Sequence, residues 1–188
     1  MNPIRKYLEN FVEMTDHDWE FFSSKLIRKT FTKKSIILKQ GDVEKYLSFV
    51  ETGVVRFYVR GTSGEQTFGF VFQNNFVSAY DSFLTQQPCP YQVETITQTT
   101  LYRINYQDLQ KVYETTGVGN ELGRRNAERL FLIKSNREIS LLNRTAEERY
   151  LDLFSSRPEL IKQIPLKYIA SYIGITPQAL SRIRKRIS

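Results

Sequence analysis

The C-terminal segment from Leu166 to Ser188 constrains the fold more than any other part of the sequence, because its apolar residues follow the spacing of two short crossing helices. Ile169 and Ile173 lie four residues apart and therefore on one face of a helix. Ala170 is small enough to let a second helix cross closely, and Gly174 can take the left-handed conformation that ends the first helix. The pattern predicts a helix-turn-helix.

Two residues mark the start of the second helix. Thr176 is a good N-cap, and Pro177 occupies the first helical position. An N–H at that position has no partner within the helix, so a proline there breaks no helical hydrogen bond. A helix is therefore predicted from Pro177 to about Arg186. Leu180 and Ile183 are predicted to face inward, against the first helix.

The opposite face of this helix is polar and basic, at the i, i+3, i+4, i+7 spacing that lines one side of a helix. Arg182 can donate two hydrogen bonds to guanine, Gln178 can pair with adenine, and Ser181 can serve a base edge or a phosphate. The alternative is a surface hairpin with a solvated charged face, but propensity alone does not place an alanine, a glycine and a Thr-Pro cap in register. The predicted DNA-binding residues are Thr176, Gln178, Ser181, Arg182, Arg184, Lys185 and Arg186.

Positive charge is concentrated in the same part of the chain. From Leu160 to the end there are six Lys or Arg and no Asp or Glu, so this segment supplies +6 of the net charge of +7. Such a concentration attracts a polyanion, and binding that depends on it weakens steeply with salt.

The rest of the composition excludes several classes of protein. With 188 residues, 40% of them hydrophobic, the chain can form one ample core or two modest domains. No apolar run approaches the roughly 20 residues that span a bilayer, and the N-terminus lacks a signal-peptide core, so we expect a cytoplasmic protein without membrane contact.

Catalysis and cofactor binding are not expected either. Cys89 is the single cysteine, which rules out an intrachain disulfide, a four-cysteine iron–sulfur cluster and a cysteine-rich zinc site. A metal-dependent barrel enzyme needs two or three histidines, but His17 is the only one, and neither a nucleophile–base pair nor a glycine-rich phosphate loop is present. We therefore predict a protein that is not an enzyme and has no cofactor.

The N-terminal and central parts have a different pattern. Thr15 and Asp18 resemble a capping box, which predicts a short helix from about Asp16 to Arg28 with an apolar stripe. Short β-rich runs follow, separated by turn residues, and the turn Gly61-Thr62-Ser63-Gly64 joins two of them into a hairpin. This spacing predicts a barrel or jelly roll. The runs are Ile36–Leu38, Tyr46–Val50, Val54–Arg60, Gln66–Phe72, Val93–Thr97 and Thr100–Ile104.

Two helices are predicted after the β-rich part, at about Tyr106–Tyr113 and Val118–Leu142. The second contains four consecutive apolar residues, 130–133, which advance about 300° around a helix and cannot all face one side. We predict that one surface covers the barrel and that the other meets a partner chain. The alternative is a central helix buried within one subunit.

The order of these parts resembles that of the Crp/Fnr family of bacterial transcription factors across nearly the whole chain. Gly41-Asp42 and the run from Tyr46 to Arg56 are similar to the glycine-marked strands of the family's cyclic-nucleotide-binding barrel. Thr145–Tyr150 is similar to the opening of the helix that begins the DNA-binding domain. The most specific match is Ile169–Lys185, which is similar to the family's helix-turn-helix.

The resemblance implies an α+β chain with three parts. They are a cyclic-nucleotide-binding-like jelly-roll barrel at residues 1–116 that would bind an effector, a dimerisation helix at 117–143, and a helix-turn-helix DNA-binding domain at 144–188. Gln178 and Arg182 would contact bases. Family members often follow the recognition helix with a β-hairpin wing. This sequence departs from that pattern, because it stops two residues past Arg186. We therefore expect a DNA-binding domain without a full wing, which relies on Arg184, Lys185 and Arg186 for phosphate contacts.

Cyclic AMP does not fit the expected effector site. Members that bind it hold it with a Gly-Glu pair and an Arg-Ser pair, whereas the matching positions here are Ser78-Ala79 and Cys89-Pro90. The stretch from Gly61 to Tyr102 also contains no Lys or Arg to neutralise a phosphate. Either a different, unidentified effector binds or aromatic side chains fill the cavity. The candidate effector residues are Ser78, Ala79, Tyr80, Phe83, Cys89, Tyr91, Lys134 and Ser135.

These observations lead to the hypothesis of a homodimeric transcription regulator that places two recognition helices in successive major grooves of an approximately palindromic operator. Its expected partners are double-stranded DNA and a second copy of the chain, with RNA polymerase as a further candidate. The alternative is a protein-interaction module that does not read DNA, and strong salt dependence of DNA binding would separate the two.

Overall fold

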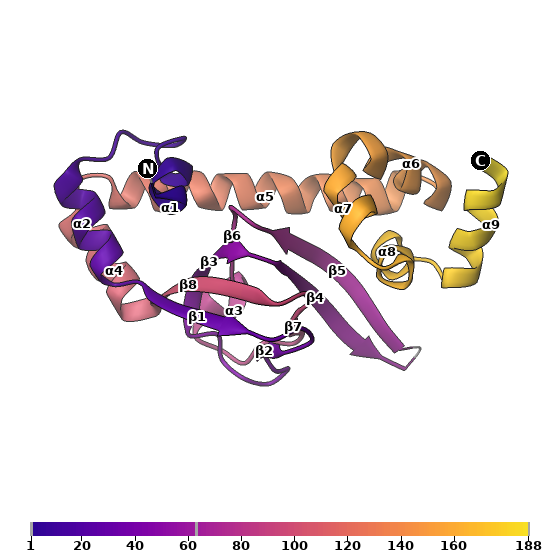
Figure 1. Cartoon of the computed structure of the whole chain (residues 1–188), viewed down its shortest axis with the longest axis horizontal. Coiled ribbons are helices and arrows are strands. Elements are labelled where there is room, and N and C mark those ends of the chain that lie inside the picture. Colours follow the sequence, from indigo (N-terminus) through magenta and orange to yellow (C-terminus); the bar gives the residue numbers. More distant parts are fainter. Residues whose placement is uncertain (1, 63, 188) are drawn as a thin grey trace. The chain divides into compact units, whose positions relative to one another are not determined.

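A computed structural model describes residues 2–62 and 64–187 of the chain (Figure 1). Ser63, in the predicted hairpin turn, and Ser188 lie outside the described residues. The chain forms two compact units. The first unit comprises the residues up to Phe57 and the segment Phe70–Arg129, and the second comprises Tyr58–Gly69 and the residues from Leu130 onward.

Within the described residues, eight strands form two four-stranded sheets with the orders β1-β8-β3-β6 and β2-β7-β4-β5. The pairings β1·β8, β2·β7, β3·β6 and β3·β8 are antiparallel. This confirms the α+β class and the β-rich centre, and each predicted strand lies within two residues of an observed one. The strands are β1 Ile27–Phe31, β2 Ile36–Leu38, β3 Tyr46–Thr52, β4 Val54–Gly61, β5 Gly64–Phe72, β6 Phe76–Val77, β7 Gln92–Thr95 and β8 Thr99–Asn105.

The prediction of a helix up to Arg28 was wrong at its end. The helix α2 covers Asp16–Ser24, and β1 begins at Ile27 and pairs with β8 along its whole length, from Ile27 opposite Arg103 to Phe31 opposite Thr99. The predicted N-cap is confirmed, because the Thr15 hydroxyl accepts a hydrogen bond from the Asp18 N–H at 3.1 Å. Long-range pairing with β8 outweighs the local helical pattern in this segment.

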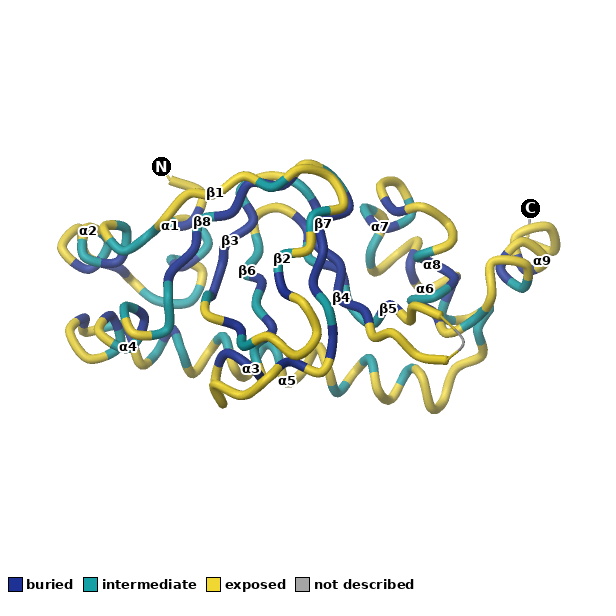
Figure 2. The backbone as a smooth tube through the Cα atoms, turned by 90° about the horizontal axis from the view of Figure 1, so that it is seen from below, coloured by how far each residue is buried: buried dark blue, intermediate teal, exposed yellow. Residues whose placement is uncertain are grey.

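The central strands are buried on both faces (Figure 2). Phe49 lies opposite Tyr102 and belongs to an apolar cluster that the helices of the first unit cover. On the other face, Val50 lies opposite Leu101, and both are 0% exposed. The sheet β1-β8-β3-β6 therefore separates a helix-covered core from the barrel interior.

The helices of the first unit are α1 Pro3–Leu8, α2, α3 Tyr80–Thr85, α4 Tyr106–Thr115 and the first part of α5 Gly119–Asn143. Neither α1 nor α3 was predicted, and both are only six residues long. No helix among the described residues is long and apolar enough to cross a membrane.

The turn between β3 and β4 depends on Gly53. Its φ is +97°, and an added Cβ would lie 2.4 Å from Thr99 Oγ1 and 2.5 Å from the Gln98 carbonyl oxygen. We expect Gly53→Ala to lower the free energy of unfolding by about 3 kcal/mol, because backbone strain and a backbone clash add together.

The matched control is Gly41→Ala, because Gly41 has a φ of +91° but nothing lies within 4 Å of the added Cβ. It should cost only about 1 kcal/mol of backbone strain. Urea unfolding followed by circular dichroism measures both variants, and equal losses would show that the clash at Gly53 relaxes freely.

The second unit contains the end of α5 and four further helices, α6 Ala146–Ser156, α7 Pro158–Gln163, α8 Leu166–Ile173 and α9 Pro177–Ile187. A capping box starts α6. The Thr145 hydroxyl accepts from the Glu148 N–H at 3.2 Å, and the Thr145 N–H donates to the Glu148 carboxylate at 2.7 Å. These hydrogen bonds hold the pKa of Glu148 below its usual value. Leu160, Ile169, Ile173 and Leu180 form the fully buried centre of this unit.

Candidate nucleic-acid interface

The helices α8 and α9 meet at a left-handed turn. Gly174 has a φ of +83°, and the N–H of the next residue, Ile175, donates to the Ala170 carbonyl at 3.0 Å. The Thr176 hydroxyl accepts from the Ala179 N–H at 3.2 Å and so caps α9. As predicted, α8 therefore ends at Gly174 and α9 begins at the Thr-Pro cap.

The inward faces of the two helices pack tightly. Ile169 and Ala170 are 0% exposed, and Leu180 is 1% exposed. The zero exposure of Ala170 is consistent with a close helix crossing at this position. Because burial turns one face of α9 inward, the residues between the buried positions face outward.

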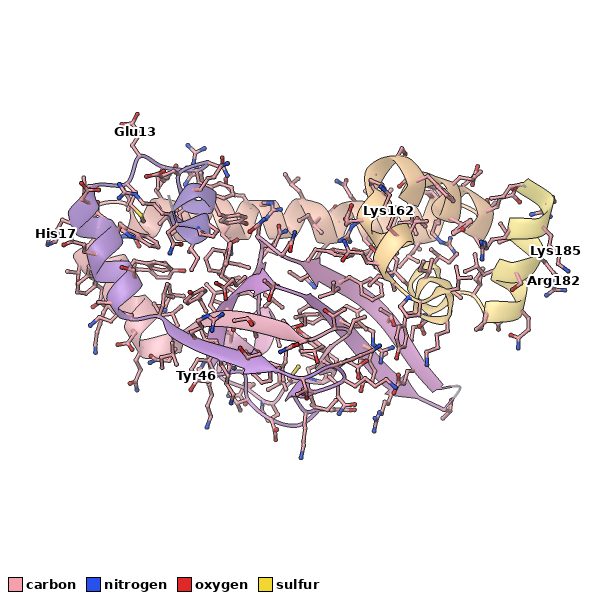
Figure 3. All side chains as sticks on the ribbon, viewed as in Figure 1. Glu13, His17, Tyr46, Lys162, Arg182 and Lys185 are labelled. Atoms are coloured by element: carbon pink, nitrogen blue, oxygen red, sulfur yellow. The ribbon has the colours of Figure 1, made fainter. Side chains whose placement is uncertain are left out.

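All seven predicted DNA-binding residues are exposed. Figure 3 shows the Arg182 and Lys185 side chains projecting from α9. Arg186 forms an ion pair with Glu147 of α6. This pair is exposed, and exposed pairs contribute little to stability, so a phosphate could replace the carboxylate. The face that results is polar and basic and contains Gln178, Ser181, Arg182 and Lys185.

Two arginines hold the C-terminal end of α8. Arg149 donates from Nε and Nη2 to the Ile173 carbonyl at 3.0 and 2.8 Å. Arg137 of α5 donates to the Tyr172 carbonyl at 2.7 Å, and its guanidinium lies 3.9 Å from the centre of the Tyr172 ring. Both cations lie where the partial negative charge of the helix end is greatest. Sequence reasoning missed these two residues because their partners lie 24 and 35 positions away.

The β4–β5 hairpin also contacts α8. The Ser171 hydroxyl accepts from the Thr67 N–H at 2.7 Å and donates to the Glu65 carbonyl at 3.1 Å. These hydrogen bonds join backbone groups of β5 to the helix that precedes α9. The sequence carries no local signal for them, since the partners are more than 100 residues apart.

The end of α5 exposes several large apolar side chains. Leu132, Ile139 and Leu142 are 59%, 52% and 78% exposed and have the a, a and d spacing of a heptad repeat. We call these three residues the seam. Phe131, beside this seam, is 70% exposed. Lys134 and Arg137 lie elsewhere around the helix, where Lys134 Nζ is 5.8 Å from the centre of the Phe68 ring. One surface of this helix end therefore contacts other residues of the second unit, whereas the seam is exposed.

In the barrel, Ser78 and Ala79 hydrogen-bond to the segment around β3. The Ser78 hydroxyl donates to the Tyr46 carbonyl at 2.9 Å, and the Ala79 N–H donates to the Glu44 carboxylate at 3.4 Å. Glu44 is 4% exposed, and burial raises its pKa. A buried carboxylate at this position is unfavourable for an anionic ligand.

The other candidate effector residues in the barrel are largely engaged by neighbours. The Tyr91 hydroxyl donates to Asp81, and burial together with Asp81 raises the pKa of Tyr91. Burial also raises the pKa of the Cys89 thiol. Phe83 is 0% exposed and stacks on Tyr80 with 6.3 Å between ring centres. Lys134 and Ser135 belong to the second unit.

Two arginines outside the stretch Gly61–Tyr102 are buried in the barrel domain. Arg56 of β4 is 1% exposed and forms an ion pair with Glu94 of β7 at 2.8 Å. The Arg103 guanidinium lies 3.9 Å from the centre of the Tyr46 ring. Arg56 already faces a carboxylate.

Among residues 2–62 and 64–187, no group of three or more His, Cys, Asp or Glu side chains could hold a metal ion.

Comparison with known proteins gives a consistent result. Residues 28–116 match the family described as the cyclic nucleotide-binding domain. No curated protein sequence matches the chain significantly. Solved structures, however, match over most of its length.

Three of these similar structures match over most of both chains. The c-di-GMP-responsive global regulator CLP of Xanthomonas campestris has a TM-score of 0.70 and 19% identity, over 92% of this chain and 91% of that one. FixK2 from Bradyrhizobium japonicum has a TM-score of 0.71 and 19% identity, over 86% and 84%. A protein from Eubacterium rectale classed in the Crp/Fnr family has a TM-score of 0.68 and 15% identity, over 95% and 87%. At these identities the likeness establishes the fold.

Proposed function

We propose that the chain, whose residues 28–116 match the cyclic nucleotide-binding domain and which has the fold of the Crp/Fnr transcription regulators, is a DNA-binding transcription regulator that works as a homodimer. In this proposal residues 1–116 are the effector domain, 117–143 the dimerisation helix, and 144–188 a helix-turn-helix domain. RNA polymerase is a candidate partner if the regulator activates transcription.

The observation that carries the proposal is the two-faced character of α9. Leu180 and Ile183 are buried, whereas Gln178, Ser181 and Arg182 are exposed one helical turn or less from them. A helix with such a face fits a major groove, where arginine and glutamine read guanine and adenine. The segment from Leu160 to the end carries a net charge of +6, which attracts the phosphates of DNA.

A second copy of the chain is the partner that fits the seam Leu132–Ile139–Leu142. Side chains at a and d positions interlock with those of another helix, and two copies of this seam would exclude about three large apolar side chains each from water. A two-fold dimer presents two α9 helices, so its operator should be an inverted repeat with half-sites about one helical turn apart.

Cyclic AMP is not the proposed effector. Its phosphate needs a cation and backbone donors, but Pro90 lacks an N–H and Arg56 already pairs with Glu94. The buried Glu44 carboxylate beside Ala79 would further oppose a phosphate.

Selection of bound DNA from a random library, with purified protein and no added ligand, tests the function. We expect an inverted repeat with half-sites about 10 base pairs apart. Recovery of no motif would contradict sequence-specific binding by the ligand-free protein.

Arg182→Ala should weaken operator binding by about 1–3 kcal/mol and relax the preference at one base pair of each half-site. The matched variant is Arg184→Ala, two residues along α9, which should weaken binding to all sequences alike because phosphates carry no base identity. Fluorescence anisotropy on the operator and on singly substituted operators measures both effects. Uniform weakening by Arg182→Ala would make Arg182 a phosphate contact.

The second candidate function is binding of a protein partner without DNA. Leu151 and Phe154 of α6 favour it, because they are 44% and 48% exposed on the second unit. DNA affinity that falls steeply between about 50 and 200 mM salt supports the regulator, whereas absence of DNA binding at low salt would favour the interaction module.

A further inference from the structure

The segment from Phe21 to Gly41 is a second concentration of positive charge in the chain. It contains six Lys or Arg and no Asp or Glu, so it carries a net charge of +6. It belongs to the first unit, whereas α9 belongs to the second. An excess of one sign over so short a stretch creates a local potential that attracts the opposite charge. The cations are Lys25, Arg28, Lys29, Lys33, Lys34 and Lys39.

Three of these residues, which we call the lysine patch, lie on β1 and in the turn that follows it. They are Lys29, Lys33 and Lys34, and all three are exposed (Figure 2). Within the part of the chain that the structure describes, none of them forms an ion pair with a carboxylate. The neighbouring Arg28, by contrast, pairs with Glu51 at 3.0 Å. The patch therefore presents three positive charges that no carboxylate of the chain pairs with.

The turn between β1 and β2 is fixed by Thr95, which is 0% exposed. The Thr95 hydroxyl donates to the Thr32 carbonyl at 2.7 Å and accepts from the Ser35 N–H at 2.9 Å. The Lys34 N–H donates to the Thr95 carbonyl at 2.9 Å. Lys34 has a φ of +64°, a left-handed conformation that is uncommon for residues other than glycine. These bonds fix the backbone from which Lys33 and Lys34 extend into solvent.

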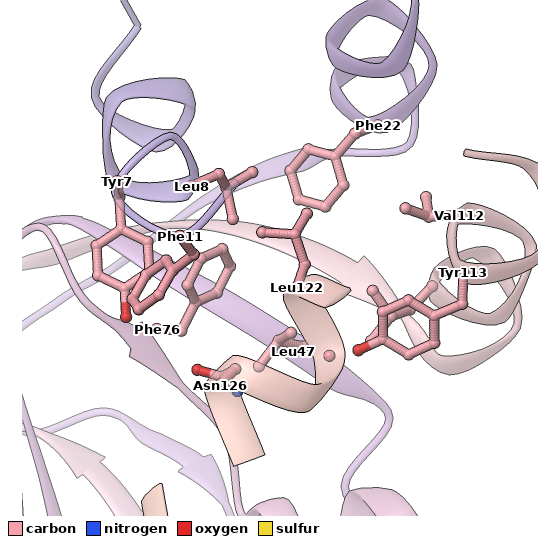
Figure 4. A pocket seen from close by; sticks show the side chains of 12 residues that line it. Tyr7, Leu8, Phe11, Phe22, Leu47, Phe76, Val112, Tyr113, Leu122 and Asn126 are labelled. Atoms are coloured by element: carbon pink, nitrogen blue, oxygen red, sulfur yellow. The ribbon is translucent and has the colours of Figure 1, made fainter. Parts of the chain in front are cut away.

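A packed core supports the sheet that contains β1. Leu47 of β3 and Phe76 of β6 lie on its helix-covered face and line, together with α1, α2, α4 and α5, a cavity of about 40 Å³ (Figure 4). This space has room for no more than a few water molecules. Strand β1 pairs with β8 at five consecutive positions without a register shift. The lysine patch therefore extends from a rigid frame, so binding orders little backbone.

The composition of the patch fits the phosphates of a nucleic acid better than the surface of a protein. Lysine is depleted in protein–protein interfaces, whereas Lys side chains and Ser or Thr hydroxyls make many of the contacts to DNA phosphates. Thr30 and Thr32, which lie between Lys29 and Lys33 in the sequence, are also exposed. From Lys29 to Lys34 an extended chain spans at most about 20 Å, which is less than one turn of DNA.

We propose that the lysine patch is a second DNA-binding surface, which binds the phosphate backbone of double-stranded DNA without reading its sequence. Each lysine neutralises a phosphate and releases a counterion. The patch then adds affinity for any duplex, while α9 selects the sequence. For the identity of the polyanion the inference rests on the proposed function, but its residues lie outside the domain 144–188.

Fluorescence anisotropy of the full chain, with a duplex of about 30 base pairs that lacks an inverted repeat, tests the patch. Glutamine at all three positions, Lys29→Gln, Lys33→Gln and Lys34→Gln, removes the charges and keeps long polar side chains. Binding should weaken at least about tenfold at about 0.1 M salt. The slope of log affinity against log salt should fall by about 3, because each phosphate contact contributes about 0.9.

The matched control places glutamine at Lys6, Lys45 and Lys111, which are exposed on the first unit outside the segment Phe21–Gly41. It removes the same three charges, so any effect of net charge alone is the same in both variants. The control should bind DNA with nearly the wild-type affinity and salt slope. Equal weakening in the two variants would overturn the proposal.

Variants of α9 separate this inference from the proposed function. One variant carries glutamine at the four cations of α9, which are Arg182, Arg184, Lys185 and Arg186. It should lose selection of a motif but keep residual binding to the duplex, and adding the three patch substitutions should abolish that residue of binding. Wild-type DNA binding by the α9 variant would contradict the proposed function instead.

Unchanged affinity and salt slope in the patch variant would overturn the inference, whatever the result for α9. The lysines would then serve an acidic protein partner or keep the exposed edge of β1 from pairing with other chains.

Discussion

Glutamate at Leu132, Ile139 and Leu142 should turn the protein into a monomer and lower its affinity for an inverted-repeat operator by at least about 100-fold. These side chains are 59%, 52% and 78% exposed in the single chain, so the substitutions should not unfold it. In a dimer the same positions would face each other across the seam, where six carboxylates would be desolvated and would repel one another. Each half-site would then be bound separately, without the gain from linkage.

Ile133→Glu is the control on the same helix. Ile133 is 50% exposed but lies outside the seam, so this change adds a comparable charge without breaking the interface. Sedimentation equilibrium gives the mass of each variant, and anisotropy gives its affinity for DNA. A triple variant that remains a dimer would show that α5 does not hold the two copies together.

Leu180→Ala should lower the free energy of unfolding of the second unit by about 3–5 kcal/mol, because it leaves a cavity at the centre of the α8–α9 contact. Leu180 is 1% exposed and lies in the same buried centre as Ile169 and Ile173. DNA binding should fall with it, since the outward face of α9 is oriented only while its inward face is packed.

Leu166→Ala makes the same chemical change at a residue that is 41% exposed, and it should cost less than about 1 kcal/mol. Thermal unfolding followed by circular dichroism at 222 nm compares the two variants. Similar small losses would mean that the α8–α9 contact closes around the missing side chain.

The elements predicted well are those whose ends carry local signals. Thr145 and Thr176 each cap a helix with their own hydroxyl, and Gly174 ends α8 with a positive φ. A cap acts through backbone groups two to four residues away, so the sequence displays it directly. The end of α2 was misplaced because the competing interaction, pairing of Ile27–Phe31 with β8, comes from about 70 residues further along the chain.

The candidate interface likewise contains residues that could be predicted from the sequence and residues that could not. The basic face of α9 could be read from helical spacing and charge, and all seven predicted residues are exposed. Arg137, Arg149 and Ser171, which bond α8 to α5, α6 and β5, had no local signal. A side chain that donates to a distant carbonyl looks, in the sequence, like any solvated polar residue.

The sequence by itself determined the ends of the C-terminal helices, the two faces of α9 and the concentration of positive charge around it, because these depend on neighbours within about one helical turn. Only the tertiary structure decided that Ser171 meets the β4–β5 hairpin and that Tyr7, Tyr113 and Asn126 surround one cavity. Those positions are brought together by packing between segments up to about 120 residues apart, and side-chain shape rather than local propensity sets where such segments touch.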